Sequence, residues 1–400
     1  MYRNGFTTLW LLPILLGLML LMLGLLARSE ALRTSWYQQT VADNMASSAA
    51  TLLAREMNLL AITNRALFAN ELTVAQLLGL ASWFQMMKDV ADRSAMASSW
   101  IPYLNAITRN IANVVQKIER PFYQVLQAVM YFQRMVTIAL RATQWYARVG
   151  FALTLPKTME QILARHELPP SKSKWQLLHA PGIVSVPWLW WTYIPAQASG
   201  SDQKLAHRLM LQSLDPFTKN RSYEWFEAIQ IEVEKAGGAR LQEADNGEWT
   251  WQSMDTVSIH VRGLLDSDEY PWGDGATYLG DEIEGVSATD FGRTSKINPT
   301  ATQWGVSDQD DFAGGAQRFR YFNRQDLDPN DWPSVIVVLP HAVAKAGAVY
   351  SRPGRWFPRA DNQYEQANLF NALWQSRLQS LSHLERTLLS TRSRTSHASF

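Results

Sequence analysis

The first hydrophobic pattern along the chain is an uncharged run over residues 6–27, FTTLWLLPILLGLMLLMLGLLA. A helix of this length rises about 1.5 Å per residue and spans the hydrocarbon core of a bilayer, which is about 30 Å thick. The run therefore predicts a membrane anchor over residues 1–28. A cleaved signal peptide is the alternative, but the run is longer than the apolar part of such peptides and Leu25–Ser29 makes a poor cleavage site.

The helical pattern continues beyond the anchor, because neither glycine nor proline occurs between Gly24 and Gly79. Within this stretch, mostly apolar positions recur at alternating steps of four and three residues, as in a packed helix. Two positions of this seam are polar, which either fixes the choice of a partner helix or places them at the margin of a wide apolar face. The candidate helix-interface residues are Leu53, Met57, Leu60, Asn64, Leu67, Glu71 and Val74.

Further helices are expected over residues 82–98, 102–118, 121–150 and 157–167, with prolines at the first turns of two of them. Residues 29–168 then form a helical bundle stalk. A linker rich in proline and serine follows at residues 168–173 and separates the stalk from the rest of the chain.

Strand patterns appear only beyond this linker. Residues 239–262 predict a hairpin around Asp245-Asn246-Gly247, and residues 335–339 predict a short buried strand that pairs with residues 346–350. Residues 263–316 are expected to be loops, residues 362–384 a helix, and residues 385–400 a disordered tail. The fold class is α+β, with a mixed head domain over residues 169–384.

Composition and motifs argue against several classes of function. A net charge of +1 gives no case for nucleic acid as a partner, and the absence of cysteine excludes disulfides and thiolate chemistry. The seven histidines show no i, i+4 metal-ligand pair, and no nucleophile elbow, P-loop or dinucleotide fingerprint occurs. We therefore predict a protein that is not an enzyme, with no cofactor and no small-molecule substrate.

Two features of the head could bind a ligand. A tryptophan-rich segment forms either a core plug or an exposed binding patch. An acidic segment supplies three oxygen ligands at calcium-loop spacing but lacks the glycine and the final glutamate of an EF-hand. The patch residues are Trp188, Trp190 and Trp191, and the calcium candidates are Asp326, Asp328 and Asn330.

Three blocks of sequence resemble the Tad/Flp pilus-assembly envelope proteins of bacteria, the TadE/TadG-like group. The main block lies in the helix after the anchor, a second block near the C-terminus comprises residues 349–353 and 365–378, and a third, weaker match lies at residues 251–256. In the main block the matching residues are Leu53-Ala54-Arg55, Asn58, Thr63-Asn64-Arg65-Ala66, Ala69-Asn70-Glu71 and Ala75-Gln76.

The resemblance implies a minor pilin-like or assembly component that packs against other pilus or secretion-system subunits through its helices. It also implies a single span in the bacterial inner membrane, with the N-terminus inside and the C-terminal domain in the periplasm. Gly5 and Phe6 match a prepilin processing site, but Trp10 stands where processed pilins carry glutamate. The alternative function is a tethered sensor or adhesin whose head binds a ligand, with calcium as a candidate.

Overall fold

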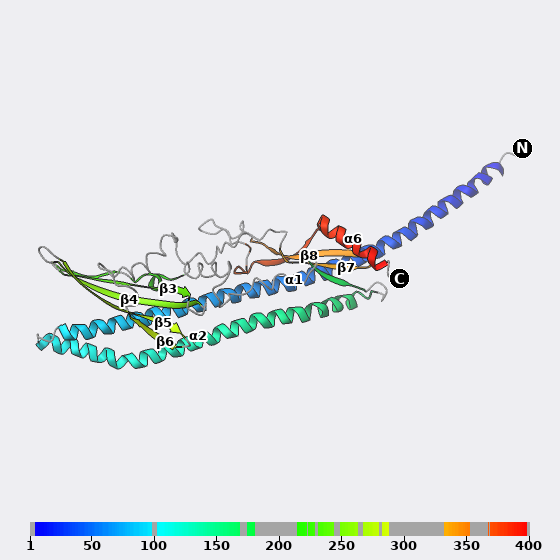
Figure 1. Cartoon of the computed structure of the whole chain (residues 1–400). Helices are drawn as coiled ribbons and strands as arrows, with labels where there is room; N and C mark the ends of the chain where they lie inside the picture. Colours follow the sequence, from blue (N-terminus) through cyan, green and yellow to red (C-terminus); the bar gives the residue numbers. More distant parts are fainter. Residues whose placement is uncertain are drawn as a thin grey trace.

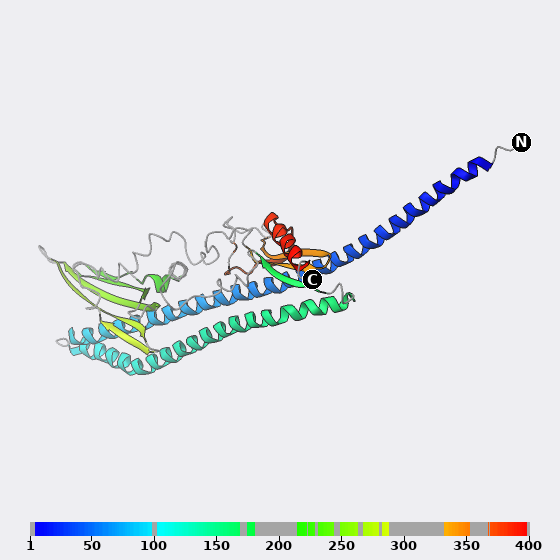
Figure 2. The same cartoon turned by 45° about the vertical axis from the view of Figure 1, so that its right-hand side comes forward.

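The computed structural model describes residues 5–97, 102–168, 174–180, 214–221, 223–228, 231–243, 249–262, 267–279, 282–287, 332–352, 367 and 369–397. Two long helices run side by side, and two antiparallel sheets lie along the first of them (Figure 1, Figure 2). The mixed α+β character predicted from the sequence is confirmed.

Helix α1 (Gly5–Ala97) is a single helix, as the lack of breakers after the anchor predicts. Pro13 lies inside it, in the apolar segment. From Leu11 to Leu26 the large apolar side chains are exposed, whereas from Gln38 onward one face of the same helix is buried. One helix therefore supplies both an exposed apolar segment and the centre of the folded part.

Helix α2 (Pro102–Arg165) returns along α1 as one helix, with Pro121 and Pro156 inside it. The sequence predicted three helices here, and the bundle stalk over residues 29–168 is not confirmed, because the described part of that range is a two-helix hairpin. An interior proline removes one helical hydrogen bond and usually bends the helix without always ending it. Packing against α1 keeps the segments before and after each proline within one continuous helix. This helix is bent near its beginning (Figure 1).

The first sheet has four antiparallel strands in the order β1-β7-β8-β9. The predicted contact between the two strands is confirmed, but its register differs, because residues 335–339 pair with residues 342–346. The predicted helix over residues 362–384 is wrong where β9 lies. The strands are β1 (Gln176–Ala180), β7 (Ser334–Leu339), β8 (Ala342–Tyr350) and β9 (Trp374–Gln379).

The second sheet has five antiparallel strands in the order β2-β3-β4-β5-β6. The predicted hairpin is confirmed, since Glu243 pairs with Trp249 at its turn end, and the turn itself lies outside the described residues. The loop predicted over residues 263–316 is wrong for β5 and β6. The strands are β2 (Tyr223–Ala228), β3 (Ile231–Glu243), β4 (Trp249–Arg262), β5 (Ser267–Leu279) and β6 (Glu282–Ser287).

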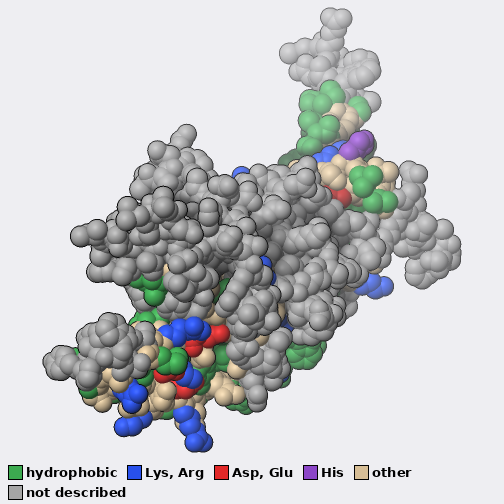
Figure 3. Space-filling model, turned by 60° about the vertical axis from the view of Figure 1, so that its left-hand side comes forward, with side chains coloured by type: hydrophobic (Ala, Val, Ile, Leu, Met, Phe, Trp, Pro, Cys, Tyr) green, Lys and Arg blue, Asp and Glu red, His purple; other side chains and the backbone are tan. Residues whose placement is uncertain are grey.

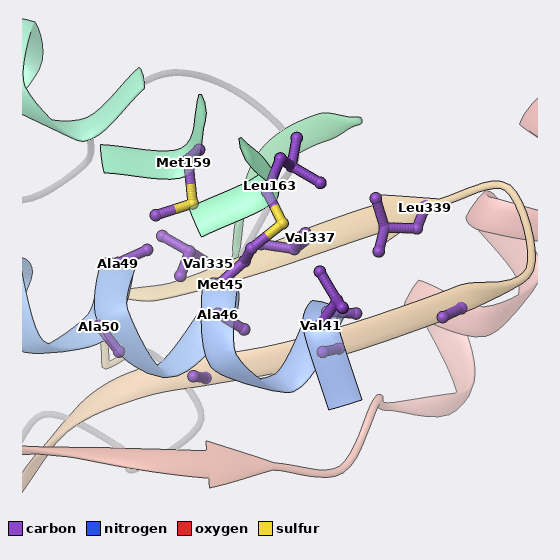
Figure 4. Packing of buried hydrophobic residues seen from close by; sticks show 14 of the residues in the cluster. Val41, Met45, Ala46, Ala49, Ala50, Met159, Leu163, Val335, Val337 and Leu339 are labelled. Carbon is purple, nitrogen blue, oxygen red and sulfur yellow. The ribbon is translucent and has the colours of Figure 1, made fainter. Parts of the chain in front are cut away.

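The core lies between α1 and the sheets along its length. Near residues 41–50, Val41 and Met45 of α1 pack between Val337 of β7 and Met159 of α2 (Figure 4). Further along, Phe68 belongs to a second core that α1 forms with α2 and the five-stranded sheet. The β region thus packs along the long helix and is not a head placed beyond the end of a stalk.

The last described element is helix α6 (His383–His397), where the sequence predicted a disordered tail from residue 385. Ser382 and Glu385 form a capping box, in which the Ser382 amide donates to Glu385 Oε2 at 2.7 Å and the Glu385 amide donates to Ser382 Oγ at 3.2 Å. Lys345 of β8 also pairs with Glu385 at 2.7 Å. The sequence analysis missed this helix start because the polar composition of the tail indicated disorder.

Candidate functional site: the anchor and the contacts along α1

The exposed segment of α1 is apolar all round. Within the described residues α1 contains the one helix segment that is long and apolar enough to cross a membrane, and none of its most apolar window is buried. A signal sequence passes the same test. In space-filling view these hydrophobic side chains stand clear of the folded part, with basic side chains at their base (Figure 3).

The base of this segment has the chemistry of a membrane interface. A shallow hollow on the helix surface is lined by apolar Leu25 and Leu32, by Arg28 and Arg33, and by Trp36. Trp36 is 73% exposed, so no part of the described fold covers its ring. Tryptophan and arginine side chains at the end of an apolar span suit the head-group layer, where one end of the side chain is wet and the other apolar.

Beyond the base, polar side chains of α1 fasten the sheets to the helix. The side-chain amide of Asn58 donates to the Trp374 carbonyl and accepts from the Trp374 amide, both at 2.9 Å. Asn58 thus satisfies the backbone of one residue of β9 in the way that a neighbouring strand would. The side-chain oxygen Oε1 of Gln38 accepts from the His341 backbone amide at 3.2 Å, at the β7–β8 turn.

Two further asparagines connect α1 to other parts of the chain. Asn64 donates to the Leu369 carbonyl at 3.0 Å and accepts from Gln144 of α2 at 2.7 Å. Asn70 donates to the Gln133 carbonyl at 2.8 Å, which joins α1 to α2. Both asparagine side chains are buried, so water does not compete for their hydrogen bonds.

Replacing Asn58 with leucine is expected to destabilise the attachment of β9 by about 2–4 kcal/mol, because both backbone groups of Trp374 lose their partner on α1. Hydrogen exchange of the Trp374 amide should then rise strongly. Thr51→Val is the matched control, since it removes one exposed bond to the Ser376 hydroxyl at 2.9 Å and should change little. Equal exchange in the two variants would contradict the role given to Asn58.

The predicted interface seam lies inside the chain. Leu53 and Met57 pack with Trp374 of β9, and Leu60, Asn64 and Leu67 are also buried. Glu71 and Val74 lie half-buried at its end. Burial raises the pKa of Glu71, and the nearby Arg141 of α2 opposes this rise. In this fold the seam contacts the chain's own sheets and α2, so it is not a free surface for a partner helix.

A buried ion cluster holds the second sheet to α1, and the sequence analysis missed it. Asp255 of β4 is fully buried and accepts from Arg221 Nη2 at 2.8 Å, from Lys235 Nζ at 2.5 Å and from Ser82 Oγ of α1 at 2.5 Å. Arg221 also donates to Ser253 Oγ at 2.7 Å. The cluster therefore joins α1, the segment after the short helix α4 (Pro216–Lys219), β3 and β4.

Two cations of this cluster, Arg221 and Lys235, contact the one carboxylate of Asp255. Burial lowers the pKa of Lys235, while Asp255 raises it. Gly237 lies opposite Asp255 on β3, and a Cβ there would collide with Asp255 Oδ1, so the sheet leaves room for the carboxylate only because this residue is glycine. With no described opening to solvent at these fully buried atoms, the arrangement suits a structural role.

A second pair of carboxyl groups faces the same sheet nearer the end of α1. Asp274 of β5 lies against Asp89 of α1, and burial together with the Asp89 charge raises the pKa of Asp274 to about 6; Arg93 and Gln85 oppose this rise. Because the folded pKa lies above the ordinary value of 3.8, the folded state binds a proton more tightly than the unfolded state. Stability from this group is therefore present at about pH 4 and is lost as the pH rises through about 6.

Asp274→Asn is expected to remove this pH dependence and to raise the melting temperature by a few degrees at about pH 7.5. Thermal unfolding of the wild type and the variant between about pH 4 and pH 8 measures the effect. Lys157→Gln, at an exposed position of α2, is the control and should keep the wild-type slope. A variant curve parallel to that of the wild type would show that Asp274 does not titrate in this range.

Several predicted sites lie outside the described residues, namely Trp188, Trp190, Trp191, Asp326, Asp328 and Asn330. Gly5 and Phe6, the candidate processing site, form the first turn of α1. In the described part of the chain no three His, Asp or Glu side chains are grouped so as to hold a metal ion.

Comparison with known proteins gives no relative for this chain. No protein-family model matches it, and neither a curated protein nor a solved structure is significantly similar.

Proposed function

We propose that this protein is a non-catalytic, membrane-anchored scaffold of the bacterial cell envelope. The observation that carries the proposal is the continuity of α1, whose exposed apolar segment runs without a break into the helix that both sheets pack on. A protein built in this way holds its folded part in a fixed direction relative to the membrane.

The positions of aromatic residues on α1 support a complete span. Trp10 lies near the start of the apolar segment over residues 6–27, and Trp36 lies on the same helix beyond its end and beyond Arg33. A helical rise of about 1.5 Å per residue separates their backbones by about 39 Å, close to the roughly 40–45 Å that includes both head-group layers. Arg28, Arg33 and Trp36 would then lie at the interface from which the folded part extends.

The Tad/Flp resemblance supports a role as a minor pilin-like or assembly component. The polar residues of the resembling run include Asn58, Asn64 and Asn70, which fasten α1 to β9 and to α2. The run thus encodes the fold that surrounds the helix. On this proposal the N-terminus is inside, the folded part lies in the periplasm, and the membrane and other pilus or secretion subunits are the partners.

Alkaline carbonate extraction of bacterial membranes, combined with protease treatment of spheroplasts, tests the anchoring and its direction. We expect the full-length chain to stay in the carbonate-resistant pellet and its C-terminal part to be cleaved from the periplasmic side. A soluble product that starts shortly after residue 28 would instead identify a cleaved signal peptide. Complete protection from protease in spheroplasts would contradict the proposed orientation.

Partner binding needs a separate measurement. Cross-linking in intact cells, followed by mass spectrometry of the purified full-length chain, should recover pilus or secretion-system subunits of the inner membrane. Recovery of soluble periplasmic ligands without such subunits would contradict the scaffold proposal.

A further inference from the structure

The outer face of α2 carries a long apolar seam that nothing in the described structure covers. Alternating steps of four and three residues lead from Ile107 to Leu153 through fourteen positions, and every one of them is apolar. Twelve of these positions are exposed, and Ala142 and Val149 are half-buried. Large side chains on the seam include Ile111, Ile118 and Phe132, which are 52%, 48% and 62% exposed.

This seam is distinct from the face with which α2 packs in the fold. Leu126 and Met130 of α2 point into the core shared with α1 and the second sheet, and Gln144 donates to Asn64 of α1. The seam residues alternate with these inward positions along the whole helix. A contiguous exposed stripe of this extent is unusual for a soluble surface and indicates an interaction site.

The spacing of the seam fits an α-helix as the partner. A seam that repeats every 3.5 residues matches an α-helix in a left-handed coiled coil, and three or four heptads already suffice for such pairing. The stripe between Ile107 and Leu153 is roughly 70 Å long at about 1.5 Å per residue.

The residues beside the seam favour pairing with an identical helix. Among the positions that flank the seam on either side from Thr108 to Ala152, Lys117 is the only charged residue. Identical helices in the same register therefore meet almost no like-charge repulsion at their edges. Tyr131, Ile138 and Trp145 occupy flanking positions and are themselves exposed, which widens the apolar surface.

The area is sufficient for a stable contact. If each exposed seam side chain loses about 50–60 Å² of accessible surface, each copy buries about 600–700 Å², and the flanking aromatic rings add to this. Stable interfaces bury about 800 Å² per partner. Two copies anchored in the same membrane also share one direction, so their α2 helices run parallel.

We propose that α2 forms a parallel, in-register coiled coil with α2 of a second copy of this chain. The parallel direction rests on the proposed membrane anchoring, whereas the use of the seam itself does not. Each seam residue then contacts the same residue of the other copy, and the two folded parts stand side by side on the membrane.

The chain has no cysteine, so single cysteines report contacts without background. Ile111→Cys, Ala128→Cys and Tyr146→Cys are made in the full-length protein in native membranes, and mild oxidation is followed by non-reducing gels. A disulfide needs Cα atoms about 4.4–6.8 Å apart, so a parallel in-register pair should form a covalent dimer at all three sites. Gln127→Cys is the control, since it is exposed on the same helix away from the seam and should stay monomeric.

The three sites distinguish the other arrangements. An antiparallel pair cross-links efficiently only near the middle of the seam, which would overturn the parallel arrangement. Adducts with a different protein, or a monomer at all three sites, would overturn pairing with a second copy. Carbonate extraction of the same membranes shows whether the anchor has failed, so loss of anchoring is distinguished from loss of pairing.

A double variant that disrupts the seam provides an independent measurement of the pairing. Val125→Glu with Phe132→Glu places charges in two seam layers, and we expect the mass of the detergent-solubilised protein to fall by half, from dimer to monomer. Asn113→Glu with Gln127→Glu adds the same charge at exposed positions away from the seam and should leave the dimer intact. A dimer that persists equally in both double variants would overturn the proposal.

Discussion

Replacing Asp255 with asparagine is expected to destabilise the protein by about 3–5 kcal/mol, because the change removes the buried carboxylate that Arg221 and Lys235 both contact. Asp255 is fully buried, and its side-chain oxygens accept from Arg221, Lys235 and Ser82. Asparagine has nearly the same volume, so the loss reports charge and hydrogen bonding with little change in packing. Urea unfolding of the full-length protein in detergent, followed by tryptophan fluorescence, measures it.

Lys235→Met is the matched control for this prediction. It removes one of the two cations and leaves the Asp255–Arg221 pair intact at 2.8 Å. The loss should be about 1–2 kcal/mol, mainly because the Arg221 carbonyl loses the hydrogen bond from Lys235 Nζ at 3.1 Å. Equal losses in Asp255→Asn and Lys235→Met would contradict a larger contribution from Asp255 than from Lys235.

The pH dependence of the Asp255→Asn variant supplies a further check. Burial already lowers the pKa of Lys235, and removing Asp255 takes away the main influence that raises it. The folded variant should therefore release the Lys235 proton at a lower pH than the unfolded chain does. Its stability then rises with pH over that interval, so the loss relative to wild type should be smaller at about pH 9 than at about pH 7.

The combination of Leu16→Arg with Met19→Arg is expected to release the protein from membranes. Each arginine near the centre of a span costs about 2.5–3.5 kcal/mol of insertion free energy, so the pair costs about 5–7 kcal/mol. Both side chains are exposed in the structure and touch no part of the fold. The fraction of protein that resists carbonate extraction is the measurement, and a large fall is expected.

Leu16→Ile with Met19→Leu is the control, because it keeps both positions apolar and should keep the protein in the membrane pellet. The circular dichroism of the released arginine variant should still show helix and sheet, since the described fold begins to bury α1 only near Gln38. Unchanged carbonate resistance of the arginine variant would contradict a span at residues 6–27.

Local signals in the sequence predicted a good part of the fold. Hydropathy and the lack of glycine and proline predicted the apolar segment and its continuation as one helix, because both depend on neighbouring residues alone. The Asn-Gly turn predicted the β3–β4 hairpin, and a run of β-branched residues predicted β7.

Strands without a clear alternation escaped prediction. Residues 267–279 of β5 contain glycine and proline, which indicated loops, yet β5 pairs with β4 along most of its length. Gly273 is required there, since a Cβ would collide with the backbone of Asp255 and the side chain of Thr256. That requirement is visible only once the partner strand is known.

By itself, the sequence determined which face of α1 is apolar and where its exposed apolar segment lies, because these follow from the order of residues along one helix. The tertiary structure decided what each face contacts. The Leu53–Val74 seam packs against the chain's own β9 and α2. Arg221 and Lys235, which lie on different elements, contact Asp255. The seam of α2 is not covered by any described part of the chain. Contacts between residues far apart in the chain depend on how the elements pack, and no local pattern specifies that packing.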